Sequence, residues 1–206
     1  VPIFTSHFYD KFGYDRPVFT LSHAMLMVGP TADFFKKTGY ILASHENADE
    51  ALRSGGLVVV FPGGDYDVYR PSTDANKIDF DGRKGYVKAA INAGVPIVPM
   101  VGIGGQETQL FLTRGEKIAK ALGPIARAAR AKVVPLSIGL PFGLSAVLPL
   151  NLPLPSKIVM QVLPPIDIHA EFGEEPDIDA VDARVRKVMH DALDELAEAR
   201  RFPVLG

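Results

Sequence analysis

The chain has 206 residues, a formal net charge of −2, a pI near 6.2 and no cysteine. This length predicts one domain with a substantial core, and the near-neutral charge offers no basic footprint for nucleic acid. The missing cysteines exclude disulfides, thiolate zinc sites and a cysteine nucleophile. The five histidines lack the spacing of a zinc site, so we expect no metal.

The first part of the chain predicts alternating strands and helices. Residues 17–29 form a mixed apolar run that predicts a strand leading to a short helix, and residues 39–43 predict a second strand. Ser44 suits the N-cap of a helix over residues 45–53, which a Ser-Gly-Gly sequence ends. Residues 57–61 predict a short buried strand, because three consecutive valines favour extended backbone.

A further helix and strand follow a polar loop over residues 68–82. Residues 85–93 predict a helix with Gly94 as its C-cap, and residues 95–101 predict an apolar strand whose prolines favour an edge, a bulge or short pairing. A strand, a helix and a strand in this order predict a βαβ unit. We therefore expect a single α/β domain over residues 1–206, with a mixed, largely parallel sheet flanked by helices.

The second half combines a basic helix with a long uncharged segment. Residues 115–131 predict a helix rich in Lys and Arg, which fits either a solvated face or adhesion to anionic lipid. Residues 133–156 carry no charge at 24 positions, but five prolines exclude a membrane-spanning helix, since each costs about 3 kcal/mol. We expect a strand over residues 133–140, then an apolar loop that covers a core or contacts lipid.

The C-terminal part predicts a strand, a connector and a long helix. Residues 157–163 are apolar and favour a strand, while residues 164–176 form a connector rich in proline and acidic residues. Residues 177–200 place most apolar side chains near one helical face. We therefore expect an amphipathic helix that packs against the sheet or a neighbouring chain.

The polar sequence directly after the 57–61 strand is the most specific feature of the chain. It contains an aromatic–proline pair, two glycines, two acids and an arginine: Phe61, Pro62, Gly63, Gly64, Asp65, Asp67 and Arg70. Glycines let backbone N–H groups approach a ligand, and polar groups at the end of a buried strand commonly form a site in open α/β sheets. A tight turn with solvated acids explains the same residues without a ligand.

Four segments, taken in order, resemble the lysophospholipid acyltransferase superfamily. Residues 61–67 resemble its Phe-Pro-Glu/Gly-Gly block, and their Gly-Gly-x-x-acid spacing is closest to the branch of type 2 diacylglycerol and monoacylglycerol acyltransferases. Residues 83–86 resemble the Arg-Lys-Gly-aromatic start of the following helix, and residues 39–48 and 94–100 resemble the second and fourth blocks. The resemblance covers residues 20–110 well and implies a fold like that of glycerol-3-phosphate acyltransferases.

The resemblance implies an enzyme that moves a fatty acyl chain from acyl-CoA to a hydroxyl of a glycerolipid or related lipid acceptor. Acyl-CoA is then a co-substrate, no metal or prosthetic cofactor is required, and the protein works peripherally on the inner, cytoplasmic face of a membrane. The implied substrate-binding residues are the seven named above, joined by Arg83 and Lys84. Arginine and lysine suit phosphate groups, although surface ion pairs explain each cation equally well.

Within that site, the resemblance gives the glycines and the acids different roles. Gly63 and Gly64 would admit the acceptor head group or the CoA phosphates. Asp65 and Asp67 would orient the acceptor hydroxyl or order the turn. Gly63 stands where phosphatidate-making members carry Glu, which favours a neutral or unusual acceptor.

The chain departs from the family at its catalytic pair, normally His-x-x-x-x-Asp or a His-Pro-His-Gly variant. No histidine here has an aspartate five positions later. Family spacing places the pair at or just before Val1, so we expect that the first block precedes Val1 and that this chain alone is inactive. His7 and His23 are the two substitute bases that the chain offers.

Three other interpretations compete with the acyltransferase. A non-catalytic lipid-binding or regulatory domain would keep the acyltransferase fold without the base. A serine lipase or esterase would need a Gly-x-Ser-x-Gly elbow, which the sequence lacks. A nucleotide site in the glycine-rich residues 102–105 is weaker still, because no Gly or Lys follows as such loops require.

Overall fold

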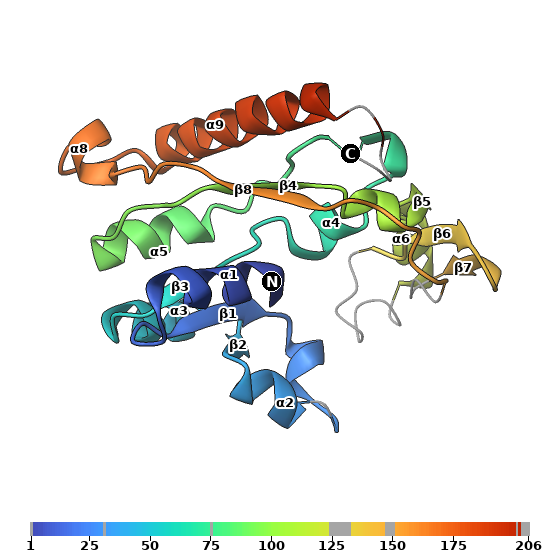
Figure 1. The fold of residues 1–206 in the computed structure, drawn as a ribbon, viewed down its shortest axis with the longest axis horizontal. Coiled ribbons are helices and arrows are strands. Elements are labelled where there is room, and N and C mark those ends of the chain that lie inside the picture. Colours follow the sequence, from blue (N-terminus) through green and yellow to red (C-terminus); the bar gives the residue numbers. More distant parts are fainter. Residues whose placement is uncertain are drawn as a thin grey trace. The chain divides into compact units, whose positions relative to one another are not determined.

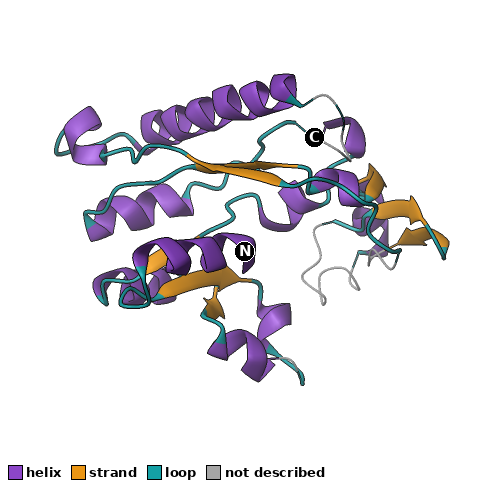
Figure 2. Cartoon of the chain, in the orientation of Figure 1, coloured by secondary structure: helices purple, strands orange, loops and turns teal. Residues whose placement is uncertain are grey.

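The computed structural model combines helices and strands, which confirms a mixed α/β class (Figures 1 and 2). It describes residues 2–30, 32–74, 76–123, 133–146, 151–200 and 202. The chain divides into two compact units of three segments each. The first unit contains Val1–Pro62, Lys84–Ile97 and Ile166–Asp182, and the second contains Gly63–Arg83, Val98–Pro165 and Ala183–Gly206. The acyltransferase domain over residues 1–206 and its likeness to glycerol-3-phosphate acyltransferases stay predictions.

The first unit is built on a three-stranded parallel sheet in the order β2-β1-β3. β1 (Val18–Ser22) lies at the centre, between β2 (Tyr40–Leu42) and β3 (Leu57–Val59). Every second residue of β1 is buried, as a strand between two neighbours in a sheet requires. The three strands predicted for this region and their parallel pairing are confirmed.

Two helices of the first unit begin and end where local residues predict. Ser44 caps α3 (His45–Arg53), because its side-chain oxygen accepts a hydrogen bond from the backbone N–H of Asn47 at 3.1 Å. α5 (Gly85–Ala93) ends at Gly94, whose φ of 63° is a left-handed conformation that glycine adopts without strain. Both predicted helices are confirmed.

Four further helices belong to the same unit: α1 (Pro2–Phe12), the 3₁₀ helix η1 (Ala24–Met27), α2 (Ala32–Lys37) and α8 (Ile168–Phe172). η1 is the short helix predicted after the first strand. The sequence pattern does not indicate α1, because none of its residues is buried and no apolar stripe marks a buried face. α8 makes the proline-rich connector partly helical, with Asp167 as an N-cap that accepts the Ala170 N–H.

The strand predicted at residues 95–101 does not extend the parallel sheet. β4 (Met100–Ile103) begins after the second proline of this segment and pairs antiparallel with β8 (Val159–Val162) in the second unit. Proline donates no backbone hydrogen bond, so the two prolines prevent a continuous ladder. β3 and β4 therefore lie in different sheets, the expected βαβ unit is not formed, and parallel pairing holds for the first unit alone.

The second unit contains another antiparallel sheet, in the order β5-β6-β7. Its strands are β5 (Leu110–Thr113), β6 (Leu136–Gly139) and β7 (Gly143–Ala146). β6 and β8 lie inside the segments where strands are predicted. β7 corrects the expectation of a loop, because the chain turns back directly after β6 and pairs Gly143 with Gly139.

Four short helical elements also belong to the second unit: α4 (Gly64–Val68), η2 (Ser72–Asp74), η3 (Gln106–Thr108) and α6 (Glu116–Leu122). α4 starts within the predicted glycine turn, and η2 lies in the predicted polar loop. The predicted basic helix over residues 115–131 appears as α6, and residues 124–132 lie outside the described residues.

α9 (Ile178–Ala199) confirms the predicted C-terminal amphipathic helix. Its buried apolar side chains recur at helical spacing: Val181, Val185, Ala192 and Leu193. Among the helices that the structure describes, none is long and apolar enough to cross a membrane.

Candidate functional site

The predicted substrate site falls where the chain passes from one unit to the other. Phe61, Pro62 and Lys84 belong to the first unit. The remaining predicted residues belong to the second unit: Gly63, Gly64, Asp65, Asp67, Arg70 and Arg83. The second unit thus holds both glycines and both acids of the motif.

Both glycines occupy positions where a side chain would collide with its neighbours. A Cβ on Gly63 would overlap the Asp67 side chain and lie 2.9 Å from the Asp79 carbonyl oxygen. Gly64 has a φ of 52°, and a Cβ there would lie 2.7 Å from Nη1 of Arg83. Glycine is therefore required for packing at Gly63 and for backbone conformation at Gly64, where a Cβ would also displace the Arg83 guanidinium.

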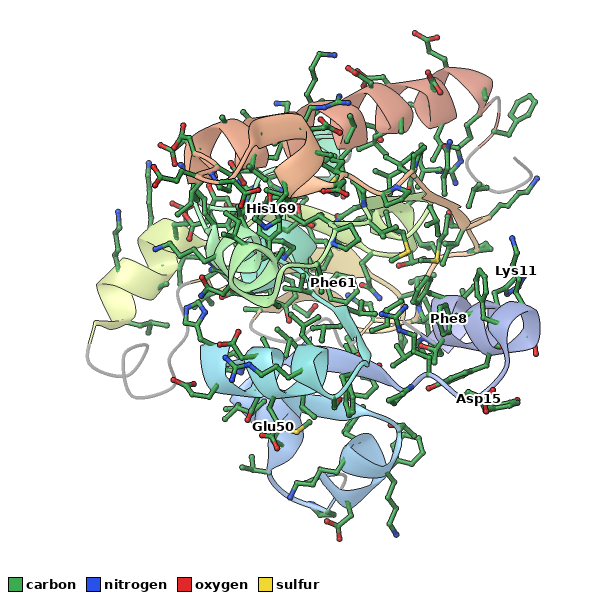
Figure 3. The ribbon with its side chains drawn as sticks, turned by 90° about the vertical axis from the view of Figure 1, so that its left-hand side faces the viewer. Phe8, Lys11, Asp15, Glu50, Phe61 and His169 are labelled. Atoms are coloured by element: carbon green, nitrogen blue, oxygen red, sulfur yellow. The ribbon has the colours of Figure 1, made fainter. Side chains whose placement is uncertain are left out.

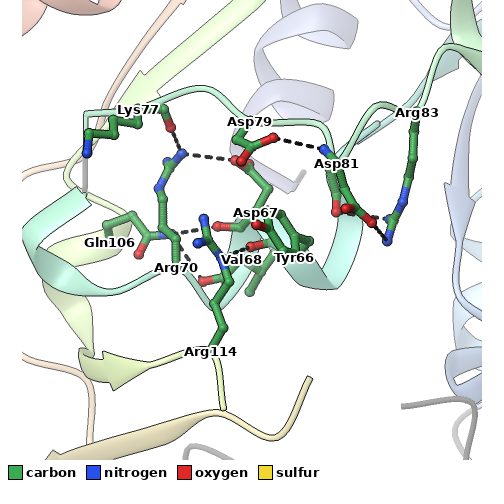
Figure 4. Close-up of polar contacts among 11 residues, drawn as sticks. Tyr66, Asp67, Val68, Arg70, Lys77, Asp79, Asp81, Arg83, Gln106 and Arg114 are labelled. Carbon is green, nitrogen blue, oxygen red and sulfur yellow. Dashed lines mark hydrogen bonds and ion pairs between the residues drawn. The ribbon is translucent and has the colours of Figure 1, made fainter. Parts of the chain in front are cut away.

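Arg83 joins the two ends of the segment from residue 63 to residue 83. Its Nη1 donates to the Gly63 carbonyl oxygen at 3.0 Å, and its Nη2 donates to Oδ1 of Asp65 at 3.1 Å. A longer contact of 3.5 Å reaches Oδ2 of Asp81 (Figure 4). The Arg83 side chain remains one-third exposed, at 33%. The guanidinium therefore holds the glycine turn while it stays accessible to a ligand.

Arg70 has a different environment, with only 8% of the residue exposed. Its Nη1 donates to Oδ1 of Asp67 at 2.9 Å and to the Lys77 carbonyl oxygen, so it closes the intervening loop (Figure 4). Its buried Nε has no hydrogen-bond partner among the described residues. These contacts support a structural role for Arg70, and phosphate binding by this residue stays a prediction.

In the first unit, Lys84 lies in an ion pair at the start of α5. Its Nζ lies 2.7 Å from Oδ1 of Asp179, and the nearby Tyr86 hydroxyl donates to Oδ1 of the buried Asp182 at 2.8 Å. These contacts join the start of α5 to the first residues of α9 and support the ion-pair interpretation of Lys84. Phe61 exposes about half its surface, 48% (Figure 3).

Two residues outside the motif contact α4. Nε of Arg114 donates to the Tyr66 carbonyl oxygen at 3.0 Å, and its guanidinium carbon lies 4.0 Å from the centre of the Tyr66 ring. Nε2 of Gln106 donates to the carbonyl oxygens of Asp67 and Val68 at 3.3 and 3.1 Å (Figure 4). Burial raises the pKa of Tyr66, because the phenolate would lose hydration. Local sequence spacing carries no signal for either contact.

The two substitute bases have different positions. Both are exposed: His7 lies on α1, and His23 lies directly after β1. Because Val59 pairs with Thr20 in register, Phe61 and His23 both follow carboxyl ends of parallel strands, where open α/β sheets bind ligands. Within the described ranges, no group of three or more potential ligand side chains could hold a metal ion.

An apolar hollow of about 590 Å³ lies in the first unit, beside β1, β2 and α3. Its lining combines apolar and polar side chains: Phe19, Met27, Lys36, Tyr40, Ile41, Leu42, Asn47, Glu50, Ala51 and Ser54. Glu50 lies on α3 (Figure 3). None of the predicted substrate-binding residues lines this hollow.

Known proteins resemble the chain over different lengths. An uncharacterized protein of Mycobacterium leprae is 29% identical over 176 residues, which cover 83% of this chain and 45% of that relative. Uncharacterized proteins of Mycobacterium bovis and Mycobacterium tuberculosis are each 34% identical over 88 residues, or 43% of this chain and 25% of each relative. The chain thus spans less than half the length of these relatives. No solved structure matches it significantly.

The family model named Acyltransferase matches residues 1–102, about half of the chain. The matched residues include the parallel sheet, the glycine turn and Arg83, so the family assignment covers the segment in which the sequence predicts a site. Through these residues the chain belongs to the acyltransferase family.

Proposed function

We propose that the protein transfers a fatty acyl chain from acyl-CoA to a hydroxyl of a glycerolipid or related lipid acceptor. The match of residues 1–102 to the acyltransferase family carries this proposal, because it includes the turn formed by Gly63 and Gly64. Acyl-CoA as the donor and a lipid as the acceptor are parts of the proposal.

The contacts around the glycine turn suit the binding and orientation of substrates. Arg83 and Arg70 contact one oxygen each of Asp65 and Asp67, and a carboxylate has a second oxygen that can accept the hydrogen bond of an acceptor hydroxyl. Arg83 is accessible and can also donate to a phosphate of CoA. In this proposal the acids orient the acceptor and Arg83 holds the donor.

The chemical step needs a general base. The base takes the proton of the acceptor hydroxyl while the hydroxyl oxygen attacks the thioester carbonyl, and CoA leaves as its thiol when the carbon–sulfur bond breaks. Of the two candidate histidines of this chain, His23 follows β1 within the first unit, at the edge of the parallel sheet where Phe61 follows β3.

We further propose that the protein works peripherally on the cytoplasmic face of a membrane, without a metal or prosthetic cofactor. Exposed lysines on α6 (Lys117 and Lys120) and exposed apolar residues such as Phe142 support contact with lipid.

The proposed activity is tested by giving purified protein an acyl-CoA and a lipid acceptor, then measuring CoA thiol and acylated lipid. Because the chain contains no cysteine, a thiol reagent responds to CoA alone. We expect the two products in equal amounts if His7 or His23 serves as the base, and neither product if this chain lacks its base. Thiol without acylated lipid would mean hydrolysis, and lipid binding without either product would favour the non-catalytic alternative.

A substitution at Gly64 tests the glycine turn itself. We expect Gly64→Ala to lower kcat/KM for acyl transfer at least tenfold, because the new Cβ meets the Arg83 guanidinium that holds the turn. Gly55→Ala is the matched control, since Gly55 also has a positive φ, 79°, but its Cβ would meet nothing within 4 Å. Both variants should lose on the order of 1 kcal/mol of stability from backbone strain. Equal turnover of the two variants would contradict a site at this turn.

A further inference from the structure

The β5-β6-β7 sheet of the second unit has apolar side chains outside, and its buried row joins Phe111 to two serines. Ser137 and Ser145 are buried, whereas the neighbouring Leu110, Ile138 and Leu144 are exposed. The register pairs Leu110 with Ile138 and Ile138 with Leu144, so these three side chains form one exposed row across the sheet. An antiparallel sheet that faces water normally shows the opposite alternation.

The turn between β6 and β7 extends this row. Leu140 and Phe142 expose 76% and 66% of their surfaces, among the largest values of the apolar residues described. Leu152 is 68% exposed and is held beside the turn, because its backbone N–H donates to the Leu140 carbonyl oxygen at 2.8 Å. We call these residues the apolar face: Leu110, Ile138, Leu140, Phe142, Leu144 and Leu152. A contiguous exposed surface of this kind marks an interaction site.

Asn151 satisfies the backbone of the turn from the inside. The residue is only 4% exposed, its Oδ1 accepts the Phe142 N–H at 3.1 Å, and its Nδ2 donates to the Gly143 carbonyl oxygen at 2.8 Å. The hydroxyls of Ser137 and Ser145 pair with each other at 2.8 Å. The turn can therefore leave water and keep these hydrogen bonds, which is what a segment must do to enter hydrocarbon.

The chain at the end of the sheet away from this turn leads into α6, which has two exposed lysines and one exposed acid, Glu116. No charged residue occurs from position 133 to position 156. Thr113 pairs with Leu136 at the far end of the sheet, and the chain continues from there into α6, where Lys117 and Lys120 are exposed. Four residues of strand separate Leu136 from the turn, or roughly 13 Å. An apolar end and a basic end at this spacing suit the hydrocarbon boundary and the headgroups of a bilayer.

We propose that the apolar face inserts into the boundary between headgroups and hydrocarbon of an anionic membrane. The exposed lysines favour anionic lipid over a second copy of this chain, which would bring identical charges to the interface. The choice of a bilayer rests on the proposed function, since an enzyme with lipid substrates must reach one.

Tryptophan fluorescence tests the insertion directly, because the chain contains no tryptophan. Phe142→Trp is the probe. Phe34→Trp is the matched control, since Phe34 lies on α2 in the first unit and is 65% exposed. With vesicles of phosphatidylcholine and phosphatidylglycerol, we expect a blue shift and quenching by lipids brominated on their acyl chains for Phe142→Trp alone. Equal spectra of the two variants on vesicles would overturn the proposal.

Vesicle flotation provides a second test with serine and threonine substitutions. The double variant Phe142→Ser/Leu144→Thr should lower the vesicle partition coefficient at least tenfold, because membrane binding then no longer removes two apolar side chains from water. Phe34→Ser should change it less than twofold. All variants should melt near the wild-type temperature, since these side chains are exposed. A blue shift of Phe142→Trp without vesicles, together with a dimer mass in sedimentation, would assign the face to a second copy instead.

The membrane surface and the acyl transfer can fail separately. Acyl transfer is measured with the acceptor in detergent micelles, where no bilayer is needed. If acyl transfer occurs in micelles and substitutions at Phe142 and Leu144 leave vesicle binding unchanged, the inference is overturned and the proposed function stays intact. Insertion of the Phe142→Trp probe without transfer to any acceptor would support the membrane surface and count against the proposed function.

Discussion

At the residue scale, Arg70 and Arg83 differ in what holds their guanidinium groups. Arg83 contacts the Gly63 carbonyl and Asp65 while one-third of its side chain stays exposed. Arg70 is buried, and its contacts to Asp67 and the Lys77 carbonyl lie inside one loop. One arginine can therefore bind a ligand and hold the turn, whereas the other stabilises the unit.

Lysine substitutions separate these two roles. Arg83→Lys should lower kcat/KM for acyl-CoA at least tenfold with little loss of stability, because a single ammonium cannot reproduce a guanidinium fork. Arg70→Lys should cost about 1–3 kcal/mol of unfolding free energy, because two part-buried acceptors lose the donor that the buried guanidinium supplies. Urea denaturation and steady-state kinetics measure the two effects. The reverse pattern, with catalysis sensitive to Arg70 and stability sensitive to Arg83, would refute the assignment.

The sequence predicts the members of this cluster that are close along the chain. Gly63, Gly64, Asp65 and Asp67 lie within one motif, and the structure brings Arg83 to them. Arg114 lies near Tyr66 only because β5 ends there in three dimensions, and in the sequence it flanks the predicted basic helix. Contacts of that kind depend on tertiary packing, which local spacing does not encode.

At the scale of elements, helices with local signals are predicted well, and the pairing of the strands after β3 is not. The cap at Ser44, the left-handed Gly94 and the apolar stripe of α9 are local features, and all three helices follow them. β4 depends instead on its distant partner β8, and β7 pairs with the neighbouring β6 through a turn, so neither antiparallel pairing is encoded in the strand's own residues. Prolines in both regions also obscure the strand pattern.

Removal of Asn151 tests how the β6-β7 turn is held. Asn151→Ala should lower the free energy of unfolding by about 1–3 kcal/mol, because the Phe142 N–H and the Gly143 carbonyl lose their shared partner. Asn92→Ala, on an exposed position of α5, is the control and should stay within about 0.5 kcal/mol of wild type. Chemical denaturation compares the two variants, and equal midpoints would show that the turn does not need Asn151.

At the scale of the whole molecule, a net charge of −2 conceals local basic groups. The exposed lysines of α6 are followed in the sequence by a long uncharged segment, so the attraction to an anionic surface is expected to come from one region. Overall charge is therefore a poor guide to the partner of this protein, and the distribution of charge is the better one.

Charge reversal tests that distribution. Lys117→Glu/Lys120→Glu should weaken binding to anionic vesicles at low salt at least tenfold, since each lysine near the surface contributes about 1 kcal/mol. The same change in net charge at exposed positions of α2, Lys36→Glu/Lys37→Glu, is the control and should have a smaller effect. The difference should shrink at high salt, where charges are screened. Equal binding of both double variants in co-sedimentation would remove the electrostatic contribution of α6.

The division of the chain into interleaved segments has a consequence for experiments that shorten or recombine it. The polypeptide passes between the two units at five points, after Pro62, Arg83, Ile97, Pro165 and Asp182. A cut at residue 102, where the family match ends, would sever β4 and discard its partner β8 together with the Ile166–Asp182 segment. The family match and the compact units therefore end at different residues in this protein. A chimera that exchanges only residues 1–102 should misfold.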